Sequence, residues 1–563
     1  MTEKPTGAQL IASTFKNLGV SHVFYMDAIL RRALMEMEFV GIKRILTHSE
    51  KTAAYMADGY ARAGRRLGIC MSQSVGAANL ASGLQDAYLA KSSVIAMTGR
   101  QPSHREHRNT HQEIDHEPLF SAVTKLTARV DSVEEWRVLF NQAVALATSG
   151  SPRPVHLDLK GHTGDMIAGA DATGLQPLDI PLGFGPAFRP AANPREVERA
   201  IAAIAAARKP AIVMGNGAVW SDAGEAVRQM SQKIGAGIVA SMDAKALLPD
   251  FEPGYAGVIG MYSRESANRV AAEADLFIYA GCDTGDWITG DWLLPKPETV
   301  PVIQIDPDPA EIGKNYIGAI GIQADVKLAL EALTAAAPAT RRDEWFARIA
   351  EIVDDFRKKA EPLRTSDGEK IRPERLLAEL ETLLTDDAFV VVDTGHASSF
   401  SASMLYLTKN QSYIRTSGSL GWALPASLGV QCAHPDKMVV CFTGDGGALY
   451  HLSELETAKR YGLNTIIIVN NNGRLQQAKK SYQHIYDGRN GNSEELYSFA
   501  PVDYSAVAQA FGCFGIRVKR PEEFADAFMK ARQSGLPAVL DVLIDEEAMP
   551  PAPWTPTELP RYL

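Results

Sequence analysis

Short runs of β-branched and other apolar residues alternate with Ala-rich amphipathic stretches along the whole chain. This alternation limits the possible folds more than any other feature of the sequence. Apolar runs of strand length that are separated by helical patterns predict parallel strands joined by helices. We therefore expect α/β domains built on doubly wound parallel sheets. The expected strands include 69–72, 93–98, 154–159, 211–214, 276–279, 302–306, 389–393, 438–442, 465–470 and 538–544.

The length of 563 residues predicts several domains, since one domain usually takes about 150 residues. Composition shifts divide the chain into three blocks at 1–185, 190–345 and 370–563. The first block ends in the Pro/Gly-rich stretch 177–190, which is typical of a linker. Blocks one and three have a similar size and rhythm, so an internal duplication is a hypothesis.

The charge balance argues against nucleic acid as a partner. There are 57 Lys and Arg against 67 Asp and Glu, a net charge of −10, whereas phosphate binding needs a basic face. No apolar run reaches the length of about 18 residues that a membrane span needs. The polar N-terminus and five scattered cysteines without C-x-x-C spacing predict a cytoplasmic protein with reduced thiols.

The most informative motif is Gly444-Asp445-Gly446-Gly447, which follows the apolar run 438–442. A helical pattern at 448–461 and a second apolar run then lead to Asn472, 27 positions after Asp445. In a right-handed strand–helix–strand unit both strand ends meet at one sheet edge, where such sheets bind ligands.

The residue types at this edge suit a metal ion and a phosphate. A carboxylate and an amide oxygen are hard ligands of the kind that Mg²⁺ accepts when it also bridges phosphate oxygens. A glycine turn at a helix N-terminus suits the phosphate itself. The alternative is an ordinary turn in which Asp and Asn act as turn formers.

A second motif is His48-Ser-Glu50-Lys-Thr-Ala53-Ala-Tyr-Met56-Ala57-Asp58-Gly59-Tyr60-Ala61-Arg62. Its small and apolar residues recur at helical spacing, so we expect one buried helix face. Glu50 stands at the head of this helix. A glutamate there is also favoured by the helix dipole alone, which is the alternative to a functional role.

Together the two motifs resemble those of the thiamine diphosphate (ThDP) enzymes, in particular acetolactate synthase and benzoylformate decarboxylase. The resemblance covers nearly the whole chain, as pyrimidine-binding, middle and diphosphate-binding blocks. It implies that Glu50 hydrogen-bonds to the aminopyrimidine ring of ThDP. It also implies that Asp445, Asn472 and the backbone carbonyl of Arg474 hold Mg²⁺.

Further cofactor-binding residues follow from the same resemblance. The segment Thr416–Ala426 resembles the family's segment that contains an apolar residue under the bent cofactor, which makes Leu420 the prop. The resemblance implies contacts with ThDP for Gly76, Asn79, Gly395, His396, Ser419, Leu420, Gly444, Gly446 and Gly447.

The loop 104–116 is rich in histidine. Gln112 aligns with a glutamine near the thiazolium in acetolactate synthase and benzaldehyde lyase, so Gln112 and the adjacent His111 are candidate catalytic residues. A zinc site and a solvated polar loop are the alternatives. The chain has Ser74-Val75 where the family has Gly-Pro, which leaves the substrate open.

The stretch Ile305–Asn315 resembles the middle domain of acetolactate synthase, which in some relatives binds FAD and in others ADP or nothing. Flavin-binding relatives have an arginine soon after the glycine of the preceding strand. This chain reads Gly281-Cys-Asp-Thr-Gly285 instead, which argues against FAD. Met214-Gly215-Asn-Gly217 is only half of a dinucleotide motif.

The resemblance implies ThDP- and Mg²⁺-dependent cleavage or formation of a C–C bond next to a carbonyl. Decarboxylation of a 2-oxo acid with carboligation is the leading hypothesis. A simple 2-oxo acid decarboxylase, an acyl-CoA lyase similar to 2-hydroxyacyl-CoA lyase or oxalyl-CoA decarboxylase, and an inactive ThDP-binding protein are alternatives. A homodimer or homotetramer is implied, because in the family Glu50 of one subunit faces the Asp445 loop of another.

Overall fold

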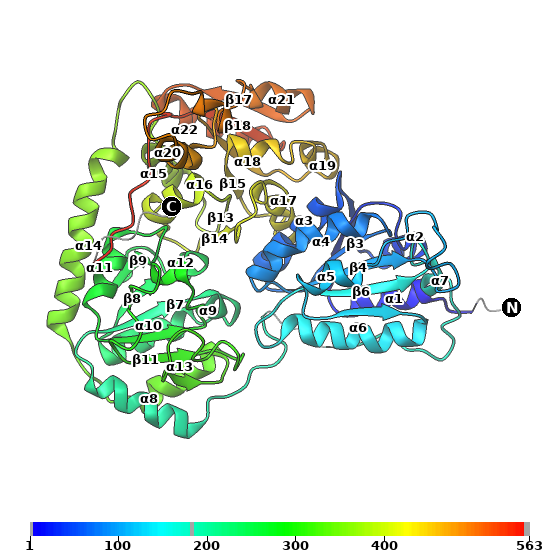
Figure 1. Ribbon diagram of the computed structural model, residues 1–563, viewed down its shortest axis with the longest axis horizontal. Coiled ribbons are helices and arrows are strands. Elements are labelled where there is room, and N and C mark those ends of the chain that lie inside the picture. Colours follow the sequence, from blue (N-terminus) through cyan, green and yellow to red (C-terminus); the bar gives the residue numbers. More distant parts are fainter. Residues whose placement is uncertain (1–3, 181–184, 557–563) are drawn as a thin grey trace. The chain divides into compact units, whose positions relative to one another are not determined.

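The structure is a computed structural model that describes residues 4–180 and 185–556. Parts of the expected N-terminal segment, of the linker 177–190 and of the C-terminal tail lie outside the described residues. Three six-stranded parallel sheets are interleaved with helices, which confirms the predicted fold class (Figure 1). In the described part of the chain, no helix combines the length and apolarity needed to cross a membrane.

The first sheet has the strand order β2-β1-β3-β4-β6-β5. Its strands are β1 (His22–Tyr25), β2 (Lys43–Leu46), β3 (Gly68–Ser72), β4 (Val94–Arg100), β5 (Thr127–Val130) and β6 (Val155–Lys160). The helices are α1 (Gly7–Asn17), α2 (Arg31–Phe39), α3 (Glu50–Gly64), α4 (Gly76–Leu89), α5 (Glu117–Ser121), α6 (Val133–Thr148) and α7 (Asp165–Ala168). The apolar core of this region includes Phe15, Trp136 and Phe140, which are fully buried.

The second sheet has the order β12-β11-β10-β7-β8-β9, so the strand order reverses between β10 and β7. Its strands are β7 (Pro210–Met214), β8 (Gly237–Ala240), β9 (Tyr255–Val258), β10 (Leu276–Ala280), β11 (Val302–Ile305) and β12 (Ile320–Ile322). The helices are α8 (Pro194–Ala206), α9 (Asn216–Trp220), α10 (Gly224–Ile234), η1 (Met242–Ala244), α11 (Glu265–Glu273), α12 (Asp286–Thr289), α13 (Val326–Ala336) and α14 (Asp343–Arg364).

The third sheet has the order β14-β13-β15-β16-β18-β17, the same pattern as the first, as an internal duplication would require. Its strands are β13 (Phe389–Val392), β14 (Ser412–Arg415), β15 (Val439–Gly444), β16 (Ile466–Asn471), β17 (Phe514–Val518) and β18 (Ala538–Leu543). The helices are α15 (Pro373–Leu383), α16 (His396–Met404), α17 (Ala423–Ala433), α18 (Asp445–Leu449), α19 (Glu454–Tyr461), α20 (Gln476–Tyr486), η2 (Ser493–Leu496), α21 (Tyr504–Ala510), η3 (Pro521–Glu523) and α22 (Phe524–Gln533).

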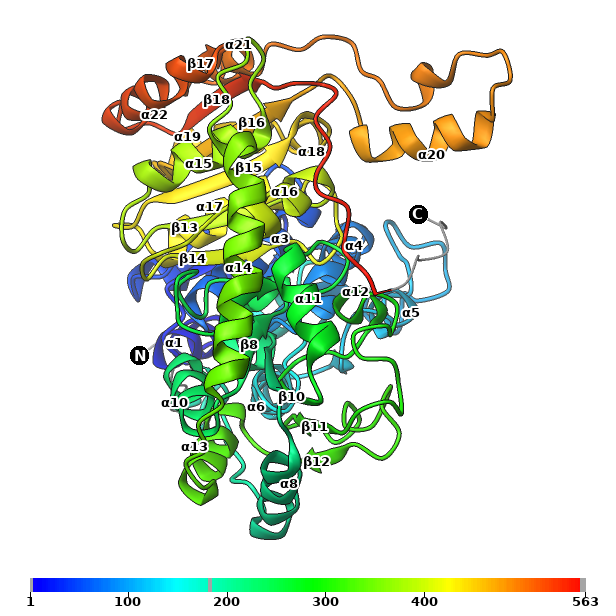
Figure 2. The same cartoon turned by 90° about the vertical axis from the view of Figure 1, so that its left-hand side faces the viewer.

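The described chain forms two compact units. The first contains residues up to 188 together with 416–439 and 451–465, and so combines the first sheet with α17 and α19. The second contains 189–415, 440–450 and the chain from 466 onward, and so contains the second sheet and nearly all of the third. Within this second unit the chain beyond β18 runs to α11, where Asn268 donates a hydrogen bond to the carbonyl of Trp554 (Figure 2).

Helices α3 and α17 touch through their backbones inside the first unit. A Cβ atom on Gly59 would lie 2.1 Å from the carbonyl oxygen of Ala426, and one on Gly429 would lie 2.0 Å from that of Met56. The indole of Trp422 donates a 2.9 Å hydrogen bond to buried Asp58 beside this crossing. Only glycine permits so close an approach, so the crossing depends on these two positions.

Replacing Gly59 with alanine should therefore destabilise the protein although alanine favours helices. The new methyl group meets a backbone atom that cannot rotate away, so the two helices must separate. We expect a loss of about 1–3 kcal/mol in the free energy of unfolding, measured by denaturant titration. Gly285→Ala is the matched control, because Gly285 has negative φ and open space around it. Equal stabilities of the two variants would contradict the proposed contact.

The expected strands are present with ends shifted by one or two residues, but the expected helix 448–461 is not continuous. The structure has α18 and α19 with a break at 450–453. Helix α19 ends at Gly462, which adopts the left-handed conformation with φ +65°. All five cysteines are buried and lie outside any disulfide bond in the described part of the chain.

Candidate active site

Glu50 begins helix α3, where Ser49 caps the helix by accepting a hydrogen bond from the amide of Thr52. Asn79 on α4 donates a 3.1 Å hydrogen bond from Nδ2 to Glu50 Oε2. A Cβ atom on Gly76 would lie 2.5 Å from Glu50 Oε1, so the glycine leaves this oxygen room. The structure thus brings together three residues that the sequence assigned to the cofactor.

The loop 104–116, which contains Gln112, adjoins the start of helix α4. Ser74 lies just before α4, and its hydroxyl donates a hydrogen bond to the backbone carbonyl of Gln112. The side-chain oxygen of Gln112 is buried and has no hydrogen-bond partner in the described part of the chain. The side chain of His111 is exposed, and its ring centre lies 6.1 Å from that of His162.

The turn that contains Ser419 and Leu420 is attached to α4 by Asp86. The buried carboxylate of Asp86 accepts hydrogen bonds from the Thr416 hydroxyl at 2.6 Å and the Ser419 amide at 3.0 Å. Leu420 is half-buried. Sequence reasoning missed the role of Asp86, although an aspartate on the buried face of an Ala-rich helix was a signal that a partner must exist.

Asp445 and Asn472 meet at the carboxyl ends of β15 and β16, which pair in parallel with Gly444 opposite Asn470. Asp445 Oδ1 accepts from the amide of Gly446 at 2.8 Å, and Oδ2 accepts from that of Arg474 at 3.0 Å. The Arg474 amide also lies 3.2 Å from Asn472 Oδ1. The three residues assigned to the metal therefore form one group.

The charge of Asp445 is poorly compensated. Burial raises the pKa of Asp445 to about 6, because backbone amides offset only part of the cost of removing the carboxylate from water. No lysine or arginine among the described residues forms an ion pair with it. A buried carboxylate without a countercharge is suited to a cation.

The turn at Gly395 and His396 lies beside the glycines of this group. Gly395 follows β13 with φ +73° and leads into α16. The carboxylate of Asp393 accepts a 3.2 Å hydrogen bond from Thr443 and would lie 3.0 Å from a Cβ atom on Gly447. Burial lowers the pKa of His396 to about 4, so its imidazole is neutral at pH 7. The Glu50 group belongs to the first unit and the Asp445 group to the second.

Three family models match the chain in sequence order. They describe the N-terminal TPP binding domain, the central domain and the C-terminal TPP binding domain of thiamine pyrophosphate enzymes, and match residues 5–119, 197–333 and 393–542. Thiamine pyrophosphate is another name for thiamine diphosphate. The chain belongs to the thiamine pyrophosphate enzyme family and is a ThDP-dependent enzyme.

Within this family the chain is similar to acetolactate synthase large subunits. It is 30% identical to the probable acetolactate synthase large subunit of Methanocaldococcus jannaschii, over 97% of this chain and 93% of that protein. It is also 30% identical to the acetolactate synthase isozyme 2 large subunit of Escherichia coli, over 96% of each. The Haemophilus influenzae acetolactate synthase large subunit is 28% identical, over 94% of this chain and 92% of that protein.

The described residues fit ThDP. A side chain at Gly76 would collide with Glu50 Oε1, and a Cβ atom on Gly444 would meet no atom within 4 Å. The second sheet gives less support for a flavin. The strand order of this sheet reverses between β10 and β7. There the amides of Gly215 and Gly217 already donate to the carbonyls of Ala280 and Gly281. These two amides are therefore not available to a pyrophosphate.

Proposed function

We propose that the protein is a ThDP- and Mg²⁺-dependent enzyme that decarboxylates a 2-oxo acid and joins the product to a second carbonyl compound. The similarity to acetolactate synthase large subunits over almost the full length of both chains carries this proposal. The grouping of Glu50 with Asn79, and of Asp445 with Asn472, supports it. The family models fall within the blocks 1–185, 190–345 and 370–563, which we keep as the proposed domains.

When bound, ThDP supplies the electron sink for breaking the bond between the carboxylate and the carbonyl carbon. Glu50 would hold the pyrimidine ring through its carboxyl group, and Asn79 orients that carboxyl group. Leu420 and Ser419 would contact the cofactor from the turn that Asp86 fixes. The substrate would meet Gln112, whose buried side-chain oxygen lacks a donor among the described residues.

The metal would bind Asp445, Asn472 and the carbonyl of Arg474, as hard oxygen ligands suit Mg²⁺. The diphosphate would contact the turn at Gly444, Gly446 and Gly447. Gly395 and His396 would also contact the diphosphate. The neutral state of His396 means that it can donate a hydrogen bond without adding a charge.

We further propose that the enzyme works in the cytoplasm as a homodimer or homotetramer. In this proposal the Glu50 group of one subunit completes the site that contains the Asp445 group of another. A separate small subunit is a further possible partner, because the relatives are named large subunits. Sedimentation analysis with and without ThDP and Mg²⁺ tests the assembly.

The test of function is a product analysis. The purified protein is given ThDP, Mg²⁺ and a panel of 2-oxo acids, with and without an acceptor aldehyde, while carbon dioxide release is followed. Release with a hydroxy ketone or acetohydroxy acid as product supports the proposal. Release with only free aldehyde as product would favour the simple decarboxylase. Turnover of acyl-CoA thioesters alone would favour the lyase, and ThDP binding without exchange of its C2 proton would favour an inactive protein.

A further inference from the structure

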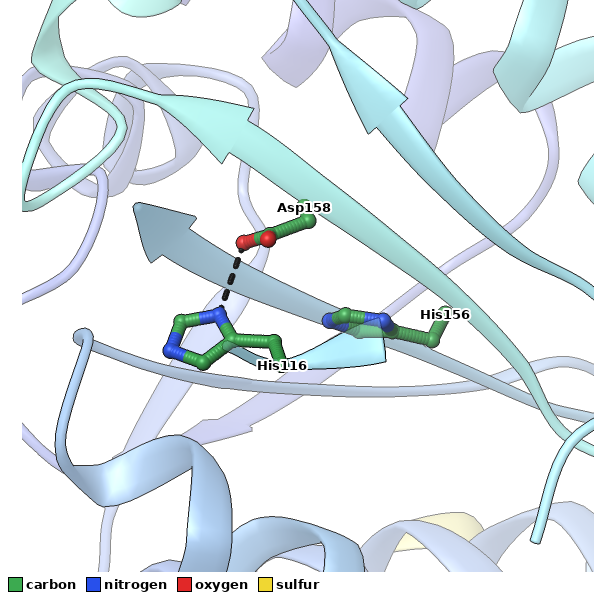
Figure 3. A group of neighbouring side chains, drawn as sticks. All are labelled: His116, His156 and Asp158. Carbon is green, nitrogen blue, oxygen red and sulfur yellow. Dashed lines mark hydrogen bonds and ion pairs between the residues drawn. The ribbon is translucent and has the colours of Figure 1, made fainter. Parts of the chain in front are cut away.

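A buried polar cluster lies in the first unit among residues that the proposed chemistry does not use. His116, His156 and Asp158 form it, and their polar atoms lie within 4.8 Å of one another (Figure 3). His116 is the last residue of the loop 104–116, while His156 and Asp158 are on β6. The exposed fractions of these residues are only 1%, 0% and 4%. Of the histidines in the loop 104–116, His116 alone takes part in such a cluster among the described residues.

The distances in this cluster fit hydrogen bonds rather than metal coordination. The hydroxyl of Thr98 on β4 lies between the three side chains, at 2.7 Å from His156 Nε2, 2.8 Å from Asp158 Oδ1 and 3.3 Å from His116 Nδ1. Tetrahedral zinc ligands stand about 3.3 Å apart, given bond lengths of about 2.0–2.1 Å. The Thr98 oxygen occupies the place that a metal ion would need.

The hydrogen-bond pattern defines where the protons lie. Thr98 donates to Asp158, so it accepts from His156 Nε2, and His156 Nδ1 accepts in turn from the Thr127 hydroxyl at 2.7 Å. Burial lowers the pKa of His156 to about 3, which keeps this ring neutral. His116 donates from Nδ1 to Asp158 at 2.9 Å. Its other nitrogen, Nε2, is buried and has no partner among the described residues.

The loop that ends at His116 depends on such polar contacts for its position. A cavity of about 340 Å³ lies between the loop and the strands, lined on the loop side by residues of 106–116 and on the other side by Arg100, Arg129 and Asp158. Polar contacts cross this space, from Arg100 to Glu106 at 3.0 Å and from Arg129 to Asp115 at 3.3 Å. Three loop residues, His107, Asn109 and Gln112, have φ between +54° and +60°, a conformation that non-glycine residues rarely adopt without support.

We propose that His116 is a positioning residue for the candidate active site. Its hydrogen bond to Asp158 fixes the C-terminal end of the loop, and Ser74 fixes the backbone of Gln112 four residues earlier. With both contacts present, Gln112 stays beside the start of α4, which also carries Gly76 and Asn79. The inference rests on the proposed function, because it concerns the 2-oxo acid that Gln112 would meet.

The test compares His116→Phe with His116→Asn in the full-length protein. Phenylalanine fills the space but cannot donate to Asp158, whereas the asparagine amide can replace Nδ1–H. We expect His116→Phe to lower kcat/KM for the 2-oxo acid by about tenfold to a hundredfold, the size of effect that a small misplacement produces. The dissociation constant of ThDP should remain within about twofold, because Glu50 and the Asp445 group are untouched. His116→Asn should restore most of kcat/KM.

Hydrogen–deuterium exchange provides a readout that does not depend on turnover. Amides of 104–113 should exchange faster in His116→Phe than in His104→Phe, a control that makes the same change at an exposed position of the same loop. If the wild-type protein turns over no 2-oxo acid, the proposed function fails, but the exchange experiment still tests the contact. Unchanged exchange in His116→Phe would overturn the positioning role. One equivalent of tightly bound zinc or iron, lost in Asp158→Asn, would also overturn it in favour of a metal centre.

Discussion

Replacing Glu50 with glutamine should lower kcat for carbon dioxide release by about 10²- to 10⁴-fold, the usual contribution of a positioned proton-transfer group. Glutamine has the same size and can still accept the hydrogen bond from Asn79, so the local structure should survive. The amide cannot exchange a proton with the pyrimidine ring of ThDP as a carboxyl group can. The measurement is steady-state turnover at saturating ThDP and Mg²⁺, together with the affinity for ThDP.

Glu117→Gln is the control for this experiment. Glu117 is also the first residue of a helix, α5, and is exposed, so the variant removes a charge at a helix start without touching the site. It should retain nearly full activity. Equal turnover of the two variants would mean that Glu50 serves only the helix dipole, which is the alternative that the sequence left open.

Replacing Asp445 with asparagine should have opposite effects on the apoprotein and the holoenzyme. The pKa of Asp445 is raised from 3.8 to about 6, which corresponds to a cost of roughly 3 kcal/mol for ionising it in the folded apoprotein. The folded state binds this proton more tightly than the unfolded state does. The stability of the apoprotein should therefore fall as pH rises from about 4 to 6, and Asp445→Asn should remove this loss.

In the holoenzyme the same substitution should be harmful, because it removes the proposed charged ligand of Mg²⁺. We expect the affinity for ThDP with Mg²⁺ to fall by more than about a hundredfold. This loss exceeds the one caused by removing a residue that only supports a metal ligand. In the wild type this affinity should also weaken below pH 6, since the metal must displace the proton. Thermal unfolding at pH 5 to 8, with and without ThDP and Mg²⁺, measures both effects.

Asp526→Asn is the matched control for Asp445→Asn, because Asp526 is exposed and, within the described ranges, forms an ion pair only with Lys530 on its own helix. It should change neither the stability of the apoprotein nor the binding of ThDP by a measurable amount. If Asp445→Asn behaved in the same way, the assignment of Asp445 to the metal would be wrong.

The local patterns predicted much of this molecule. The strands and the parallel class of the sheets follow from side-chain periodicity, because each strand must bury both faces. The two cofactor motifs also predicted that Glu50 begins a helix and that Asp445 and Asn472 end neighbouring strands. The break between α18 and α19 was missed, because the apolar spacing of 448–461 continues through it.

Residues whose roles depend on contacts distant in sequence could not be assigned in advance. Asp86 holds a turn more than 300 positions away, and Gly59 is required by a carbonyl group of another helix. His116 was one of several histidines in a polar loop until the fold placed Asp158 beside it. Its hydrogen bond crosses 42 positions of the chain.

Sequence patterns predicted the α/β class, most of the strands and helices, and the residues that we propose for ThDP binding. These properties depend on periodicity and on motifs whose members are close in the chain. The burial of polar side chains and the identity of their partners became known from the three-dimensional fold. The cost of burying a carboxylate or an imidazole depends on neighbours that distant segments supply, as Asp445 and His156 show.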